Sequence, residues 1–177
     1  MGTSRDPIGP APSGGGAVIF LTVGSVLPFE RLVAAVDDWA GRHPETEIFA
    51  QTKGGRYTPR HMAHAEILSP AEFARRLDAA ELIIAHAGMG SAIMAAERAK
   101  PVILFPRRAA LREHTTDHQL DTVKFLEGRP GIHVATDPET LDRAIAEARK
   151  GGGGERLSSA APPTFIANLR AAIAALD

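Results

Sequence analysis

The stretch Leu82-Ile-Ile-Ala-His-Ala-Gly-Met-Gly-Ser91 indicates the fold class, because it joins an apolar segment to a glycine-containing turn. The segment Leu82–His86 has the length and composition of a strand. The glycines at positions 88 and 90 predict a turn into a helix that ends near Lys100. A strand that leads directly into a helix is the unit from which α/β sheets are built.

The same alternation extends over most of the chain. Residues 17–23 are apolar on both faces, which predicts a strand buried in a parallel sheet. Other strands are predicted at residues 47–51, 65–68, 101–106 and 132–135. Helices are predicted at residues 28–41 and 69–80, around residues 120–126, and from a cap at Asp137 to about Lys150. The predicted fold is α/β, a Rossmann-like doubly wound, mostly parallel sheet flanked by helices.

Composition limits the classes of function. The chain has 177 residues, of which 44% are hydrophobic, a formal net charge of −1 and no cysteine. A near-neutral chain lacks the basic surface of a nucleic-acid-binding protein, so we expect no nucleic-acid partner. The absence of cysteine excludes disulfides, thiolate catalysis and cysteine-ligated metal centres.

Glycine and proline divide the chain into four predicted segments. Residues 1–16 predict a flexible leader without the apolar stretch of a signal peptide, and residues 17–150 an α/β domain. Residues 151–162 predict a flexible linker, and residues 163–177 an amphipathic helix that packs on the domain or reaches a partner. The run 17–23 is far shorter than the roughly 20 residues of a membrane-spanning helix. We therefore expect a cytoplasmic protein that contacts a membrane only through a partner.

Ligands of doubly wound sheets bind beyond the carboxyl ends of the strands, and the turn after residue 86 is the strongest candidate there. Its glycines let the backbone approach a ligand, and the following helix offers free N–H groups to a phosphate. The candidate residues are His86, Gly88, Met89, Gly90 and Ser91. The alternative is a tight turn without a ligand, because short glycine motifs are weak signals.

A second candidate is the polar segment Glu113-His-Thr-Thr-Asp-His-Gln119, which leads from a loop into a helix. Carboxylate and amide groups there could bind sugar hydroxyls. The alternatives are helix capping and a metal site at His114, Asp117 and His118. Gly24 and Ser25, after the first strand, are a third candidate, with an ordinary turn as the alternative. The basic loop with Lys53, Arg56 and Arg60 is interpreted as solvated, with recognition of an anionic group as the alternative.

Four motifs in order resemble a known family: Phe20-Leu-Thr-Val-Gly-Ser25 followed by Pro28-Phe29, then His86–Ser91, Lys100-Pro101 and Asp117-His118-Gln119. They resemble the C-terminal, donor-binding half of family 28 GT-B glycosyltransferases. The resemblance is closer to the small Alg13-like and PssE-like subunits of split enzymes, and it covers about residues 18–149. It implies a Rossmann-like fold of the GT-B C-terminal domain type and a UDP-sugar as the usual ligand.

The resemblance also implies roles for the candidate residues. The turn at residues 88–91 would hold the diphosphate, Asp117 and Gln119 would contact sugar hydroxyls, and the loop at residues 24–25 would face an interdomain cleft. The family's chemistry is direct displacement with inversion at the anomeric carbon, generally without a bound metal. We therefore expect no metal site and no cofactor.

This sequence departs from the family pattern at the position that usually holds the ribose hydroxyls. Many members have a glutamate six residues after the first glycine of the turn, where this chain has Met94. Glu97, about one helical turn further on, is a candidate substitute. Ala99 stands where a glycine is usual before Lys100. Both departures favour the PssE-like branch.

A GT-B enzyme works between two domains, and this chain has the length of only one of them. The resemblance therefore implies a hexosyl- or glucuronosyltransferase subunit for exopolysaccharide synthesis, active only with a partner. That partner would be a membrane-anchored Alg14-like or PssD-like subunit, which binds a lipid-linked acceptor and supplies the general base. The alternative is a non-catalytic nucleotide-sugar-binding or regulatory module. A sugar-nucleotide epimerase and a dehydrogenase are less consistent with the length and the motifs.

Overall fold

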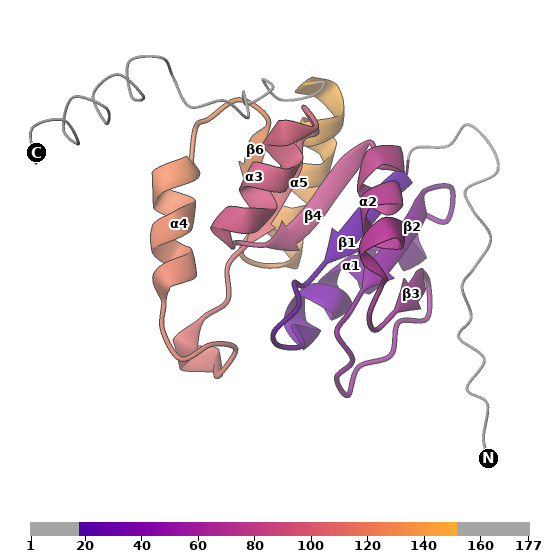
Figure 1. The fold of residues 1–177 in the computed structure, drawn as a ribbon, viewed down its shortest axis with the longest axis horizontal. Coiled ribbons are helices and arrows are strands. Elements are labelled where there is room, and N and C mark those ends of the chain that lie inside the picture. The colour runs from indigo at the N-terminus through magenta and orange to yellow at the C-terminus, as the bar shows by residue number, and fades with distance from the viewer. Residues whose placement is uncertain (1–17, 152–177) are drawn as a thin grey trace, which may run out of the picture.

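Strands and helices alternate along residues 18–151, the part of the chain that the computed structural model describes (Figure 1). The strands are β1 (Val18–Thr22), β2 (Glu47–Gln51), β3 (Ala63–Ala65), β4 (Leu82–His86), β5 (Val102–Phe105) and β6 (Ile132–Val134). The helices are α1 (Glu30–Arg42), α2 (Pro70–Ala79), α3 (Met89–Glu97), α4 (His118–Leu126) and α5 (Pro138–Gly151), with a short 3₁₀ helix η1 (Ala109–Leu111). The predicted leader, the C-terminal helix and all but the first residue of the predicted linker lie outside the described residues.

The strands form one sheet in the order β3-β2-β1-β4-β5-β6, and all their pairings are parallel. This is the strand order of dinucleotide-binding Rossmann folds. The order reverses between β1 and β4, and the helices that follow these two strands pack on opposite faces of the sheet. Such a reversal opens a crevice beyond the carboxyl ends of the two strands.

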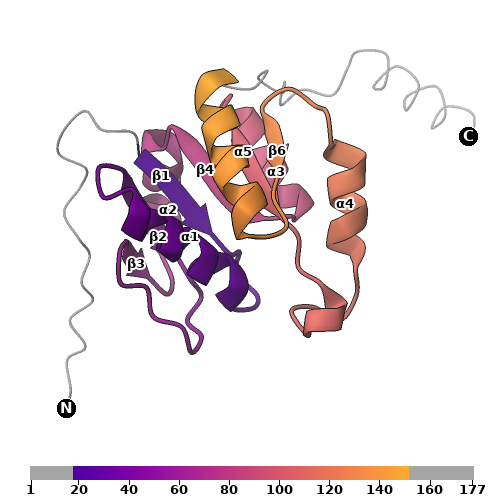
Figure 2. The same cartoon turned by 180° about the vertical axis from the view of Figure 1, so that it is seen from behind.

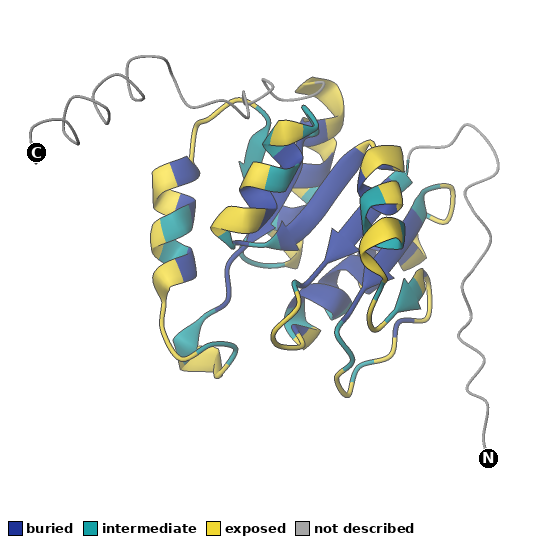
Figure 3. Cartoon of the chain, viewed as in Figure 1, coloured by how far each residue is buried: buried dark blue, intermediate teal, exposed yellow. Residues whose placement is uncertain are grey.

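Helices α1 and α5 cover one face of the sheet, and α2, α3 and α4 lie on the side of the other (Figures 1 and 2). Side chains of β1 alternate between these layers: Ile19 and Leu21 belong to the α1–α5 core, whereas Phe20 belongs to the core under α2 and α3. The central strands are therefore buried on both faces (Figure 3). This confirms the predicted fold class.

The predicted bounds of β2 and β4 are confirmed, but the strand predicted at residues 65–68 is wrong in position. β3 ends at Ala65 because its neighbour β2 ends at Gln51. Beyond β2, three consecutive residues at positions 53–55 have left-handed φ angles of 59°, 74° and 114°. Residues 66–68 therefore have no parallel partner on β2, and Leu68 packs against the core under α2.

Helix α3 ends at Glu97, before the predicted end near Lys100. The N–H of Lys100 donates to the carbonyl of Ala95 at 3.0 Å, and that of Ala99 to Ala96 at 3.1 Å. Together these bonds form a Schellman motif, which requires a left-handed residue just past the helix. Ala99 adopts that conformation, with φ of 52°. The glycine expected before Lys100 would fit this position without strain.

The predicted cap of α5 is confirmed, and α2 begins with a cap of the same kind. Ser69 Oγ accepts from the Glu72 N–H at 3.2 Å, and Asp137 Oδ1 accepts from the Thr140 N–H at 2.8 Å. Each cap is followed by a proline in the first turn, where the missing N–H costs no hydrogen bond. No helix within residues 18–151 combines the length and the apolar character that crossing a bilayer requires.

Candidate functional site

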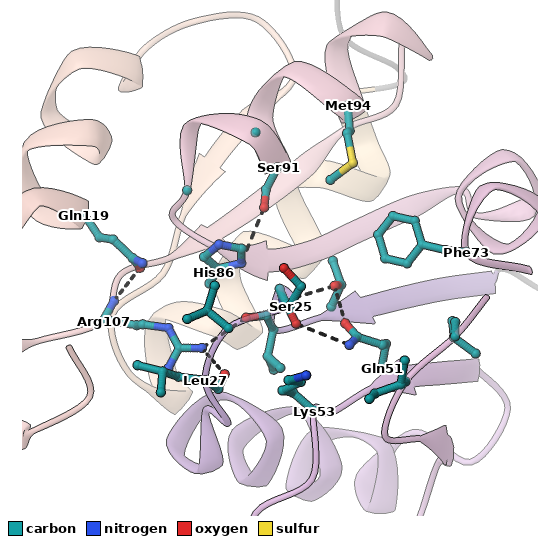
Figure 4. Close-up of a pocket in the computed structure, with 18 of the residues that line it drawn as sticks. Ser25, Leu27, Gln51, Lys53, Phe73, His86, Ser91, Met94, Arg107 and Gln119 are labelled. Atoms are coloured by element: carbon teal, nitrogen blue, oxygen red, sulfur yellow. Dashed lines mark hydrogen bonds between the residues drawn. The ribbon is translucent and has the colours of Figure 1, made fainter. Parts of the chain in front are cut away.

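A cavity of about 620 Å³ lies beyond the carboxyl ends of β1 and β4, where the strand order reverses (Figure 4). Its walls come from the loop after β1, the end of β2, the start of α2, the turn into α3 and the segment after β5. The predicted site residues that line it are Gly24, Ser25, His86, Gly88, Gly90, Ser91, His114, His118 and Gln119. The structure thus brings together residues from all three candidate segments.

The imidazole of His86 packs against the backbone of two glycines. A Cβ atom added at Gly24 would lie 2.7 Å from Cε1 of His86, and one added at Gly88 would lie 2.6 Å from Nε2. Both distances are far shorter than the roughly 3.5 Å of a favourable contact. Gly24 also has a φ of +84°, which side chains rarely adopt. The histidine ring therefore explains why glycine is needed at both positions.

Gly90 is different, because a Cβ added there would meet no atom within 4 Å. It lies in the first turn of α3, at the positive end of the helix dipole. The N–H of Ser91 donates to the carbonyl of Gly88 at 3.0 Å, whereas those of Met89 and Gly90 have no acceptor among the described residues. Next to Gly90, Ser91 is buried, with its Oγ 3.4 Å from Nδ1 of His86. The turn therefore presents hydrogen-bond donors next to open space, as an anion site requires.

His86 is held in its neutral form. Burial lowers its pKa to about 4, and the positive charges of Arg107, His114 and His118 contribute to the shift. At neutral pH the His86 ring is therefore a hydrogen-bonding group without charge.

Arg107, which lines the cavity, is hydrogen-bonded to the loop after β1. Its Nη1 donates to the carbonyl oxygens of Pro28 at 2.7 Å and Glu113 at 3.3 Å, and its Nη2 to those of Val23 at 3.0 Å and Leu27 at 2.7 Å. The guanidinium is buried, and burial lowers its pKa. One buried side chain thus joins the loop after β1 to the segment after β5.

Gln119 is buried at the start of α4, and its side-chain oxygen accepts from the backbone N–H of Arg107 at 3.0 Å. This bond fixes the orientation of the amide (Figure 4). No described residue accepts from its Nε2, and the side chain lines the cavity. Its N–H groups are therefore donors for a ligand.

The side-chain amide of Gln51 lies across the cavity from Gln119, and both its oxygen and its nitrogen are hydrogen-bonded to protein groups (Figure 4). Gln51 Oε1 accepts from Thr22 Oγ1 at 2.8 Å, and its Nε2 donates to the carbonyls of Gly24 and Glu66 at 3.2 Å. It ties the end of β2 to the loops after β1 and β3. Lys53, two residues further on, also lines the cavity.

One wall of the cavity is apolar. Leu68, Pro70 and Phe73 contribute to it from α2 and the residues before it, and Met94 from α3. Phe73 is fixed by an edge-on contact with Phe20 of β1, with ring centroids 5.3 Å apart. An apolar wall opposite hydrogen-bond donors is typical of a site for a ligand with a flat ring and a charged end.

The two predicted acidic residues of the 113–119 segment bind protein groups. Glu113 forms a two-point ion pair with Arg31 of α1, at 2.6 and 2.8 Å, and accepts from the Arg108 N–H. Asp117 accepts from the Ala109 N–H at 2.8 Å. Neither carboxylate is among the cavity's lining residues.

Two more predicted residues lie outside the lining. Met89, the first residue of α3, is 42% exposed, and Glu97 is the last residue of that helix, 3.9 Å from Arg98. Met94, which replaces the usual glutamate of the resembled family, lines the cavity itself. A ligand role for Met89, Glu97 and the two acidic residues stays a prediction.

Sequence reasoning assigned no role to several residues at the cavity. Gln51 and Arg107 end or directly follow predicted strands, and Lys53 lies two residues past one. The strand-end rule marks these segments but does not single out the three side chains. Lys53 was expected in a solvated loop but lines the cavity. Nothing in the local pattern indicated Phe73, because α2 is not at a strand end. Within residues 18–151, no three histidine or acidic side chains are grouped in a way that could hold a metal ion.

Comparisons with known proteins agree with this architecture. Residues 18–163 match the family described as the glycosyltransferase family 28 C-terminal domain. A search of curated protein sequences gave no match. Among solved structures, ALG13 is similar with a TM-score of 0.58 and 16% identity, over 82% of this chain and 91% of ALG13.

Similar structures also occur within longer proteins. The kitacinnamycin glycosyltransferase matches with a TM-score of 0.57 and 17% identity, over 81% of this chain and 38% of that protein. The UDP-GlcNAc 2-epimerase of Neisseria meningitidis, solved with UDP-GlcNAc, matches with a TM-score of 0.55 and 10% identity, over 80% of this chain and 40% of that one. The chain thus spans about two fifths of these proteins. At such identities the structures show a shared fold, whereas the family match covers most of the chain, which therefore belongs to glycosyltransferase family 28 as its C-terminal domain.

Proposed function

We propose that this chain binds a UDP-sugar as the donor-binding subunit of a two-component inverting glycosyltransferase. The observation that carries the proposal is the cavity at the β1–β4 reversal, which joins the open N-terminus of α3 to an apolar wall. None of the described residues that line it is acidic. An anionic ligand with a flat ring fits that combination of surfaces.

The diphosphate would lie at the N-terminus of α3, beside Gly90 and Ser91. Lys53 lines the same cavity and brings a positive charge that favours an anion, and His114 and His118 add ring nitrogens that can form hydrogen bonds. These donors supply the charge stabilisation that the diphosphate needs, so we propose no metal and no cofactor. The uracil would pack on the apolar wall formed with Phe73.

The sugar would lie toward α4, where Gln119 offers N–H donors to its hydroxyls. In the transfer, an acceptor hydroxyl forms the new bond to the anomeric carbon while the bond from that carbon to the diphosphate oxygen breaks. The departing UDP carries the negative charge, which the N-terminus of α3 stabilises. The acceptor's proton would go to a base on the partner, as the resemblance to split glycosyltransferases implies.

The partner would be a membrane-anchored Alg14-like or PssD-like subunit with a lipid-linked acceptor, in bacterial exopolysaccharide synthesis. The chain would then be cytoplasmic and peripheral to the inner face of the membrane. The exposed rim of the cavity supports a docking surface, since Val26 is 78% exposed and Ile67 67%. The similarity to ALG13 over 91% of that protein supports a chain that works as a separate subunit.

Calorimetric titration of the full chain with UDP, UDP-glucose, UDP-glucuronic acid and UDP-N-acetylglucosamine, with and without magnesium, tests donor binding. We expect binding without magnesium and at least a hundredfold loss in Gly90→Val, because the added side chain would occupy the open space at α3. Gly151→Val is the matched control, since Gly151 also has open space but lies at the end of α5. Equal binding by the two variants would contradict the proposed site.

A second candidate is a non-catalytic nucleotide-sugar-binding module, for which the same cavity would serve. A transfer assay on the co-purified complex separates the two. If the complex transfers sugar and Ser91→Ala or Gln119→Ala abolishes transfer while the subunits still assemble, the chain is catalytic. If transfer is unchanged in both variants, the cavity serves only binding or regulation.

A further inference from the structure

We infer that this site binds 2′-deoxyribonucleoside diphosphates about as tightly as ribonucleoside diphosphates. The inference rests on the proposed function and concerns the pentose of the nucleotide. Its basis is Met94, which places a thioether where recognition of ribose hydroxyls needs a strong acceptor.

The position of Met94 on α3 determines which part of a bound nucleotide would lie next to it. Met94 lies three and four residues after Ser91 and Gly90, so the three residues share one side of the helix, and all line the cavity. Met94 is about one turn, roughly 5.4 Å, further along the helix axis. A nucleotide with its diphosphate at Gly90 and its base on Phe73 would place its pentose beside Met94 (Figure 4).

No carboxylate is on hand for the 2′-hydroxyl among the described residues that line the cavity. Rossmann-like sites commonly hold ribose hydroxyls with a carboxylate, and a thioether sulfur accepts only weakly. The described lining contains no aspartate or glutamate, and Glu97 at the end of α3 is not part of it. The amide of Gln51, at the end of β2, is already bonded to three protein groups. A 2′-hydroxyl would therefore give up water without gaining a charged acceptor, which is the partner that forms the stronger hydrogen bond.

The test compares UDP with 2′-deoxy-UDP, which differ by a single hydroxyl, in titrations of the full chain. We expect the two dissociation constants to agree within threefold. Met94→Glu restores a charged acceptor and should raise the preference for UDP to about tenfold or more. Met94→Leu, an apolar control, should leave the ratio unchanged, and melting curves will show whether each variant is folded.

The outcomes separate this inference from the proposed function. A tenfold or greater preference of the unmodified chain for UDP would overturn the inference alone, and so would an unchanged ratio in a folded Met94→Glu variant. If the unmodified chain binds neither nucleotide, the proposed function fails and this inference fails with it.

Discussion

The turn into α3 and the segment that leads into α4 lie on two sides of one cavity, but they use their polar groups differently. At the turn, a side chain added at Gly90 would meet only open space. In the segment after β5, the groups of Arg107, Glu113 and Asp117 are bonded to backbone or to another side chain. The first region leaves open space beside its hydrogen-bond donors, and the second mainly holds the loops that shape the cavity.

The largest effect should come from removing the central anchor of the second region. Arg107→Met leaves four carbonyl oxygens without their donor, so we expect a loss of about 3 kcal/mol or more in the free energy of unfolding. UDP affinity should fall as well, because the loop after β1 loses its support. Denaturant unfolding measures the first effect and calorimetry the second. A variant as stable as the unmodified chain would show that the segment does not hold the loop.

The two glycines of the turn should respond differently to the same change. Gly88→Ala forces a methyl group against the His86 ring and should cost about 1–3 kcal/mol. Gly90→Ala meets no atom and replaces a glycine inside a helix, so it should be neutral or stabilise by up to about 1 kcal/mol. Thermal melts of both variants measure the difference.

We attribute the different stability effects of Gly88→Ala and Gly90→Ala to the His86 ring, and a double variant tests this cause. In a His86→Ala background, Gly88→Ala should lose most of its cost. If the cost persists, the strain at Gly88 comes from the backbone and the account of the turn is wrong.

The pH dependence of stability should also reflect His86. Its pKa is about 4 in the folded chain against 6.5 for an unperturbed histidine, so between these values the unfolded chain binds the proton and the folded chain does not. Stability should therefore fall as the pH drops from about 6.5 toward 4, by at most about 1.4 kcal/mol per pH unit from this group. Urea unfolding across this range, compared with His86→Gln, isolates the contribution. An identical slope in the variant would assign the pH dependence to other groups.

The contrast also shows what the sequence could reveal. The fold followed from alternating apolar runs and turn residues, because burial on both faces leaves a continuous apolar pattern. The place of the cavity followed from the strand-end rule. The sequence could not show which polar groups are already occupied, because the partner of Glu113 lies on α1, 82 residues earlier. It also could not show that Gly24 and Gly88 make room for His86, since that contact depends on how the loops after β1 and β4 meet.

The smallest stability effect is expected at Glu113, where it tests whether the carboxylate holds a loop or contacts a ligand. Glu113→Gln weakens the partly buried pair with Arg31 and should lower stability by about 1 kcal/mol, because the amide keeps the shape but loses the charge. Asp142→Asn is the matched control. Its partner Arg42 is also on α1, but both side chains of that pair are at least 40% exposed, so the loss should stay below about 0.5 kcal/mol.

Ligand affinity gives the decisive contrast within this segment. Glu113→Gln should change UDP-sugar affinity less than threefold, because the carboxylate does not line the cavity, whereas Gln119→Ala removes a donor that does. If Glu113→Gln weakened binding tenfold without lowering the melting temperature, the carboxylate would be a ligand contact. The segment before α4 would then belong to the binding surface as fully as the turn into α3, and the division between the two regions would no longer hold.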